Sequence, residues 1–294
     1  MKNDLDPVFL FSYFKGHGDG LHLAWSANGF EWTALNNDEP FLTPDVGQEK
    51  LMRDPFLLPA SDGMFHLVWT AEWHGKGIGY AFSPDLLRWS SQRWLGVMEH
   101  EEHARNCWAP EIFFDDSKGE YIIYWASSVP GRFPLTDHMG DNGLNHRMYC
   151  VTTRDFQSFS KTRLFFDGGF DVIDATLVKN GKGYLLFMKD ETLNPVQKNI
   201  RMSAGNEIFG GFKKISPPLT GAYWAEGPSA LKIGDKWIVY FDKYKLNRIG
   251  AISSRDLQTW VDISDQVHFP PGAQHGSAVV VPYTRIKHLI ENSQ

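Results

Sequence analysis

Short apolar runs, rich in aromatic and β-branched residues, recur along the chain at the length of a β-strand. They cover residues 9–14, 65–70, 121–125, 184–188 and 237–241. Four of the five follow a cluster of turn-forming residues, such as the Asn-Gly-Lys-Gly stretch at 180–183. Turn clusters between such runs predict antiparallel hairpins. Helical periodicity is confined to the last residues, about 285–292, so the chain is expected to be all-β.

A repeated pattern follows these runs. It consists of Ser or Thr, then Asp or Asn two positions later, then an aromatic residue four positions further on. Copies begin at Ser26, Ser83, Thr153 and Ser254, and a degenerate copy begins at Ser203. Five copies at intervals of 50 to 70 residues predict five sheets of about four strands each. Arranging such sheets around an axis protects their edges, whereas a solenoid of them is harder to close. The sequence therefore predicts one five-bladed β-propeller over residues 1–294.

The two ends of the chain complete each other in this scheme. Residues 8–35 supply a middle and an outer strand with no inner strand before them. Residues 275–282 supply an inner strand with nothing after it. The C-terminal inner strand is therefore expected to join the N-terminal strands and close the ring.

Composition narrows the function classes. The 294 residues include 21 Phe, 10 Tyr and 11 Trp, and the net charge is −6 without long charge runs. This balance argues against nucleic acid or an acidic membrane as partner. Cys107 and Cys150 are expected to be reduced core thiols. No signal peptide or membrane span is recognisable, so a cytoplasmic location is expected for the sequence as it stands, and a periplasmic or secreted one if a leader has been removed. The oligomeric state is left open.

Each predicted inner strand opens with a polar residue next to Gly, Pro or Ala. These residues are Asp54, Glu111, Asp174, Glu226 and His275. Equivalent positions of successive blades converge on the propeller axis, so all five are expected to surround one funnel. Acids at strand starts also cap loops, which is the role expected for the acidic residues of the outer repeat. Clustered carboxylates repel one another and raise each other's pKa, a cost typical of functional sites. Glycosidic hydrolysis uses such a pair as proton donor and base, and a third acid can tune the donor.

At these motifs the sequence resembles glycoside hydrolase family 43, the five-bladed propeller arabinofuranosidases, xylosidases and related enzymes. The resemblance covers essentially the whole chain. It implies Asp54 as general base, Asp174 as pKa modulator and Glu226 as general acid, with inversion at the anomeric carbon. Glu111 stands where many members have Asp, and Ala175 follows Asp174 where many have Pro. The family also implies no required cofactor, with a structural calcium, held through water near His275, as a further expectation.

Side chains near the motifs are candidates for holding sugar. The predicted substrate-binding residues are Arg53, Trp73, Trp108, Glu111, His146, Trp224 and His275. Indole rings pack on the C–H faces of sugars, although each of these tryptophans could instead serve blade packing. The longest insertion, residues 127–147, is expected to wall the pocket, as long loops on rigid scaffolds often do. A walled pocket favours removal of a terminal sugar over cleavage within a chain.

These features predict an inverting, exo-acting glycoside hydrolase whose partner is a carbohydrate. The first choice is release of α-L-arabinofuranose from a plant or algal polysaccharide side chain or oligosaccharide. β-Xylosidase and galactosidase or galactofuranosidase activity fit the same scaffold. Two other classes stay open: a carbohydrate-binding propeller without catalysis, and a phosphorylase, which would need a basic cluster at the axis.

Overall fold

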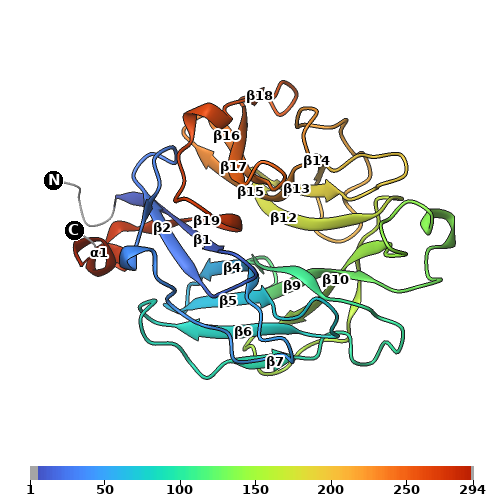
Figure 1. Cartoon of the computed structure of the whole chain (residues 1–294), viewed down its shortest axis with the longest axis horizontal. Coiled ribbons are helices and arrows are strands. Elements are labelled where there is room, and N and C mark those ends of the chain that lie inside the picture. The colour runs from blue at the N-terminus through green and yellow to red at the C-terminus, as the bar shows by residue number, and fades with distance from the viewer. Residues whose placement is uncertain (1–5, 293–294) are drawn as a thin grey trace.

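Five small antiparallel sheets surround a common axis in a computed structural model that describes residues 6–292 (Figure 1). The first blade contains β19 (Gln274–Pro282), β1 (Pro7–Phe14), β2 (His22–Ser26) and β3 (Thr33–Ala34). The second contains β4 (Arg53–Pro59), β5 (Phe65–Thr70), β6 (Ile78–Ser83) and β7 (Arg93–Leu95). The third contains β8 (Trp108–Asp115), β9 (Glu120–Ser128), β10 (His146–Thr153) and β11 (Arg163–Phe166).

The remaining blades complete the ring. The fourth contains β12 (Val172–Asn180), β13 (Gly183–Asp190) and β14 (Asn199–Gly205), and the fifth contains β15 (Glu226–Ile233), β16 (Lys236–Lys243), β17 (Arg248–Ser254) and β18 (Val261–Asp262). Helical turns are η1 (Asn36–Asp38), η2 (Pro134–Thr136), η3 (Ser264–Gln266) and α1 (Tyr283–Glu291). The five-bladed propeller is confirmed. The fourth blade has three strands where about four were expected, since its outer edge is reduced to one bridge between Ser203 and Ile215.

The ring closes as the sequence predicts. β1 pairs with β19 in antiparallel register, from Pro7 opposite Pro282 to Phe14 opposite Gln274. The first and last parts of the described chain therefore share one sheet, and α1 lies beside it (Figure 1). No helix between residues 6 and 292 is long and apolar enough to cross a membrane.

The repeated pattern of the outer turns has a local hydrogen-bonding cause. In the second blade, Leu86 donates its amide to Ser83 Oγ at 2.7 Å, and Leu87 and Arg88 donate theirs to Asp85 Oδ1 at 3.0 and 2.8 Å. Side-chain oxygens thus accept the amides for which a tight turn provides no backbone acceptor. Asp155 and Asp256 accept two amides each in the same way. The capping role expected for these acids is confirmed.

Each inner strand carries a bulge at its axial end. The register of β4, β8, β12 and β15 with their middle strands shifts within the first residues. Near each shift one residue has left-handed backbone: Asp54, Ala109, Asp174 and Gly227 have φ of 52°, 46°, 51° and 59°. For the three that are not glycine this conformation costs about 1 kcal/mol or more. Of these residues, Asp54 and Asp174 have side chains that line the axial cavity.

The blades are also joined by polar contacts near the axis. At every junction a side-chain oxygen of one blade accepts a backbone amide from the next inner strand. The pairs are Ser277 with Leu57 (3.3 Å), Thr70 with Ala109 (2.8 Å), Tyr124 with Leu177 (3.0 Å), Asp174 with Gly227 (3.1 Å) and Ser229 with Ala278 (2.8 Å). Apolar clusters fill the space between the blades. Cys107 and Cys150 are free and buried, as expected.

Candidate active site

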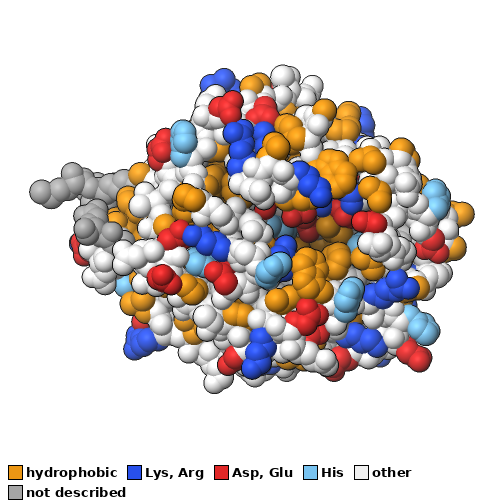
Figure 2. All heavy atoms as spheres, in the orientation of Figure 1, with side chains coloured by type: hydrophobic (Ala, Val, Ile, Leu, Met, Phe, Trp, Pro, Cys, Tyr) orange, Lys and Arg blue, Asp and Glu red, His pale blue; other side chains and the backbone are white. Residues whose placement is uncertain are grey.

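A cavity of about 320 Å³ opens at the axial end where the inner strands begin. Its lining residues are Arg53, Asp54, Thr70, Trp73, Trp108, Ile173, Asp174, Lys189, Glu191, Glu226, Tyr244 and His275. Figure 2 shows red acidic side chains on the floor of a central hollow, with orange hydrophobic ones around it. Two larger hollows, of about 670 and 560 Å³, are lined without any Asp or Glu, and a third, of about 340 Å³, includes Asp115 and Glu207. The axial cavity has four acidic side chains in its lining, so it is the best equipped of these for acid–base chemistry.

Two predicted acids meet the predicted histidine in this cavity. His275 Nδ1 lies 3.0 Å from Asp54 Oδ1 and 3.9 Å from Asp174 Oδ2. Thr70 Oγ1 donates a hydrogen bond to the other oxygen of Asp54 at 2.7 Å. The three strands that supply Asp54, Asp174 and His275 are β4, β12 and β19, which are far apart in sequence. The imidazole therefore fixes the orientation of two carboxylates from different blades.

Burial and neighbouring charges shift the pKa values of Asp54, Asp174 and His275 by different amounts and in different directions. Burial opposes ionisation of Asp54, but the His275 imidazolium and the Arg53 guanidinium outweigh it and lower the pKa of Asp54 to about 2. Burial also disfavours charged His275, yet the Asp54 and Asp174 carboxylates raise its pKa to about 10. Burial is the main reason why the pKa of Asp174 rises to about 6, with Glu226 and Asp54 adding to the rise. At neutral pH, Asp54 is thus an ionised carboxylate next to an imidazolium.

Gly227 explains the Glu-Gly-Pro motif. A Cβ at Gly227 would lie 2.2 Å from Cδ2 of His275, and its φ of +59° is a conformation that suits glycine. The same residue donates its amide to Asp174 Oδ2 at 3.1 Å. The glycine therefore lets the imidazole approach closely and holds Asp174 in place, while the motif's first residue, Glu226, projects into the cavity lining.

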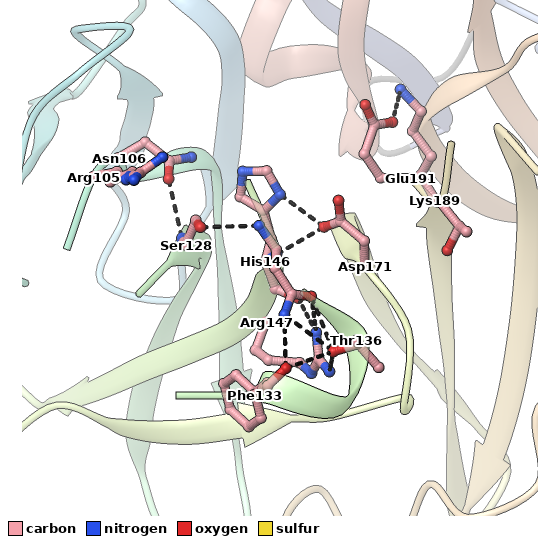
Figure 3. Close-up of polar contacts among 12 residues, drawn as sticks. Arg105, Asn106, Ser128, Phe133, Thr136, His146, Arg147, Asp171, Lys189 and Glu191 are labelled. Atoms are coloured by element: carbon pink, nitrogen blue, oxygen red, sulfur yellow. Dashed lines mark hydrogen bonds and ion pairs between the residues drawn. The ribbon is translucent and has the colours of Figure 1, made fainter. Parts of the chain in front are cut away.

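A buried lysine holds the predicted general acid. Lys189 Nζ lies 2.9 Å from Glu226 Oε2 and 2.6 Å from Glu191 Oε2. Its side chain is 2% exposed, so the two carboxylates are what makes its charge tolerable. Figure 3 shows Lys189 paired with Glu191. Lys189 restricts the orientations open to Glu226.

Two tryptophans form the aromatic wall. Trp108 donates its indole N–H to the Trp73 carbonyl at 2.9 Å, and the two rings meet edge to face at 5.8 Å. The Arg53 guanidinium lies 4.5 Å from the Trp73 ring. Trp73 is 39% exposed, so its surface is open to a ligand. The structure thus brings Arg53, Trp73 and Trp108 to the cavity, where sugar contacts were predicted.

Glu111 does not line the cavity with the other predicted axial residues, although it lies close enough to His275 and Asp174 to interact with their charges. The Pro of Trp-Ala-Pro-Glu stands level with Pro55, so the residue equivalent to Asp54 is Ala109 and Glu111 is two positions deeper. Its side chain is buried, accepts a hydrogen bond from Tyr124 at 2.6 Å and does not line the cavity. Burial raises the pKa of Glu111 to about 8.

His146 and the long insertion also take a different place. His146 is 1% exposed; its amide and its Nδ1 contact Asp171 Oδ1 at 2.7 and 2.8 Å (Figure 3). Its ring lies 5.0 Å from that of Trp108, so it supports the aromatic wall from behind. None of residues 127–147 lines the cavity, since Arg147 ties the insertion inward through Thr136 and Asn145. The structure therefore does not support the pocket wall expected there. Trp224 lies next to Tyr244, outside the cavity lining.

Besides Ile173, which precedes Asp174, four polar lining residues escaped the sequence reasoning: Thr70, Lys189, Glu191 and Tyr244. All four lie at or just after the ends of middle strands β5, β13 and β16. A middle strand runs antiparallel to its inner strand, so it ends where the inner strand begins. The polar residues after the predicted middle strands were therefore the signal that could have found them.

The expected calcium has no evident ligand set. The described range, residues 6–292, contains no group of three or more His, Cys, Asp or Glu side chains arranged to hold a metal. The imidazolium form of His275 has no free lone pair for a cation. The calcium stays a prediction.

The propeller and its axial cavity bring together the carboxyl groups that hydrolysis of a glycosidic bond requires. A family model described as "Probable glycosyl hydrolase domain", of the kind related to family 43, matches residues 6–288, and the chain belongs to this family. An α-L-arabinofuranosidase of Bifidobacterium longum subsp. longum is 23% identical over 282 residues. That match covers 86% of this chain but 26% of the relative, so the chain spans about a quarter of the relative's length.

Solved structures share the fold at low identity. An α-L-arabinofuranosidase from Lactobacillus brevis superposes with a TM-score of 0.57 at 19% identity, over 72% of each chain. An exo-β-1,3-galactanase from Phanerochaete chrysosporium superposes with a TM-score of 0.55 at 12% identity, over 75% of this chain and 52% of the other. These similarities establish the shared propeller.

Proposed function

We propose that this domain hydrolyses a glycosidic bond with inversion, and that terminal α-L-arabinofuranose is the first sugar to test. The observation that carries the proposal is the single cavity in which Asp54, Asp174 and Glu226 meet around His275. The relative from Bifidobacterium longum bears the name of that activity. Xylosides and galactosides remain in the panel because structural neighbours include a β-1,3-galactosidase and an exo-β-1,3-galactanase.

The side chains divide the reaction between them. Glu226 donates a proton to the glycosidic oxygen as the bond to the anomeric carbon breaks. Asp54, ionised beside His275, accepts a proton from the water that attacks that carbon from the opposite face. Asp174 holds the Gly227 amide and faces His275, so it keeps base and acid strands in a fixed relation. Trp73 and Trp108 offer an apolar wall to the sugar ring.

Replacing the proton donor tests this assignment. Glu226→Gln should lower kcat on substrates with poor leaving groups by about a thousandfold, because proton transfer contributes about 10²–10⁴-fold. Loss on 4-nitrophenyl glycosides should be smaller, since 4-nitrophenolate leaves without protonation. The measurement is a panel of 4-nitrophenyl glycosides and the matching oligosaccharides, with NMR of the first-formed anomer.

The control is Glu207→Gln, which changes an exposed carboxylate away from the cavity and should keep wild-type rates. Unchanged turnover in Glu226→Gln would refute its role, and a retained anomer would refute inversion. Sugar binding without release of any product would instead favour the non-catalytic carbohydrate-binding propeller.

A further inference from the structure

An aromatic and basic shelf adjoins the cavity on the side of Glu226. It consists of Trp224, Tyr244, Lys198 and Lys245. The rings of Trp224 and Tyr244 lie 5.9 Å apart, and Tyr244 is itself part of the cavity lining. Lys245 Nζ lies 5.0 Å from the Trp224 ring and 5.7 Å from the Tyr244 ring. Lys198 Nζ approaches Trp224 at 5.7 Å.

One ammonium group on this side of the cavity has no carboxylate partner among the described residues. Glu191 contacts both Lys189 and Lys198, and Glu226 contacts Lys189 as well. Lys245 is exposed and takes part in none of the ion pairs found among residues 6–292. Lys189 and Lys198 are therefore paired, and Lys245 is the ammonium group of the shelf that can meet an anionic ligand. Figure 2 shows blue basic and orange hydrophobic side chains gathered along one rim of the central hollow.

The position of the shelf relates it to the leaving group. A general acid protonates the glycosidic oxygen, so the sugar that departs lies beyond the acid as seen from the cavity. Trp224 precedes Glu226 by two residues, and Tyr244 follows β16, whose Asp242 pairs with Glu226. The shelf therefore lies where the leaving-group sugar would emerge. This step rests on the proposed function, through the role of Glu226.

We propose that the shelf binds a leaving-group sugar that carries an anionic group, either the carboxylate of a uronic acid or a sulfate ester. The rings offer apolar surface to the C–H face of the sugar, and the Lys245 ammonium meets the anion. A neutral sugar would contact the rings alone and would leave the Lys245 ammonium to solvent. Both sources share the chemistry of an oxyanion on a sugar ring, and the experiment separates them.

Binding to the inactive Glu226→Gln protein tests the proposal directly. The probes are trigalacturonate, a sulfated disaccharide derived from κ-carrageenan, and neutral galactotriose, each titrated by calorimetry at low and high salt. At least one anionic probe should bind about fivefold or more tighter than galactotriose, and the advantage should shrink with salt. Preference for one anionic probe identifies the source of the charge. Equal affinity for all three probes overturns the proposal.

Substitutions of single lysines test whether the shelf causes the preference for an anionic probe. In the same background, Lys245→Met should remove most of the preference, and Lys245→Arg should keep it. Lys232→Met is the matched control, because Lys232 is an exposed lysine 6.0 Å from Trp237, and it lies near the opposite end of β15 from Glu226. An anionic preference that survives Lys245→Met refutes the shelf.

One further assay distinguishes failure of the shelf proposal from failure of the proposed function. Wild-type protein is assayed on the 4-nitrophenyl panel. If no glycoside is hydrolysed, the catalytic proposal fails. The shelf proposal then fails with it, because the shelf is proposed to bind the leaving-group sugar of that reaction. If hydrolysis occurs and the probes bind alike, only the shelf is refuted.

Discussion

The same residue type performs opposite tasks in this chain, depending on which strand end it occupies. Asp54 is buried at the axis beside an imidazolium, whereas Asp85 accepts amides in an outer turn. Both have a pKa lowered to about 2, although burial acts against it in each. The imidazolium and a guanidinium are responsible at Asp54, while backbone amides and Arg88 are responsible at Asp85. Of these two carboxylates, only Asp54 lines the axial cavity and can take part in the proposed reaction.

Removing the imidazolium should shift the pH profile. In His275→Asn the burial of Asp54 is no longer opposed by the facing positive charge, so the pKa of Asp54 rises from about 2. The base must be ionised to act, so activity should be lost at higher pH than in the wild type. We expect the acidic limb of kcat/KM to move up by about one pH unit or more, since an opposite charge nearby shifts a carboxyl by about 1–3 units.

The measurement is the pH dependence of kcat/KM on the best 4-nitrophenyl glycoside. His268→Asn is the control, because His268 is an exposed histidine that pairs with Glu31 away from the cavity. A merely structural role for His275 would lower activity at all pH values and leave the limb in place, which would contradict the assignment.

The sequence predicted which acids lie near the propeller axis, but not which of them line the cavity and which lie deeper. Asp54, Asp174, Glu226 and His275 could be found because each opens an inner strand and the blade period repeats. Glu111 was misplaced because it follows the proline that is level with Pro55, so that Ala109 stands at the position of Asp54 and Glu111 lies two residues deeper. The burial of His146 depends on Asp171, a contact between segments that no local pattern reveals.

At the scale of the element, the outer turn is the unit that repeats most faithfully. Asn28 accepts the amides of Phe30 and Glu31 at 2.8 and 3.0 Å, as Asp85 does in the next blade. The amide oxygen of Asn therefore serves where the carboxylate of Asp serves elsewhere. This local chemistry is why the blade count could be predicted from sequence alone, while the thinner edge of the fourth blade, with its degenerate copy, could not.

The turn predicts a contrast between two substitutions. Asp85→Ala removes the acceptor of two amides and should lower the free energy of unfolding by about 1 kcal/mol, the size of a lost cap. Asp85→Asn retains the acceptor and should cost clearly less, as Asn28 shows by its own contacts. Urea unfolding at pH 7 measures both, and equal losses would contradict the hydrogen-bonding explanation.

The same turn has a defined pH dependence. The pKa of Asp85 is lower in the folded protein than in the unfolded chain, so its contribution is present above the unfolded value and disappears as pH falls toward about 2. The difference in unfolding free energy between wild type and Asp85→Asn should therefore shrink between pH 5 and the lowest pH at which the fold persists.

At the scale of the whole molecule, two features close the ring: strand pairing within the first blade and hydrogen bonds between neighbouring blades. β19 and β1 bring the two ends of the described chain into one sheet, and five side-chain acceptors join the blades near the axis. Asp174 lines the axial cavity, where it is part of the proposed catalytic set, and it also belongs to this ring of contacts. The geometry of the site is therefore coupled to the closure of the propeller, and the blades are expected to unfold together.

Ser229→Ala tests that coupling at the junction of the last blade with the closing strand. Ser229 is buried and its Oγ accepts the Ala278 amide at 2.8 Å, so the substitution leaves a buried amide without its partner. The expected loss is about 1–3 kcal/mol, and calorimetry and tryptophan fluorescence should both report one transition at a lower temperature. Ser158→Ala, an exposed control in an outer turn, should stay within about 0.5 kcal/mol of wild type. A closed ring cannot lose one junction without loosening its neighbours, so a separate early transition of the closing blade in Ser229→Ala would show that the blades are independent units and would refute the single cooperative domain.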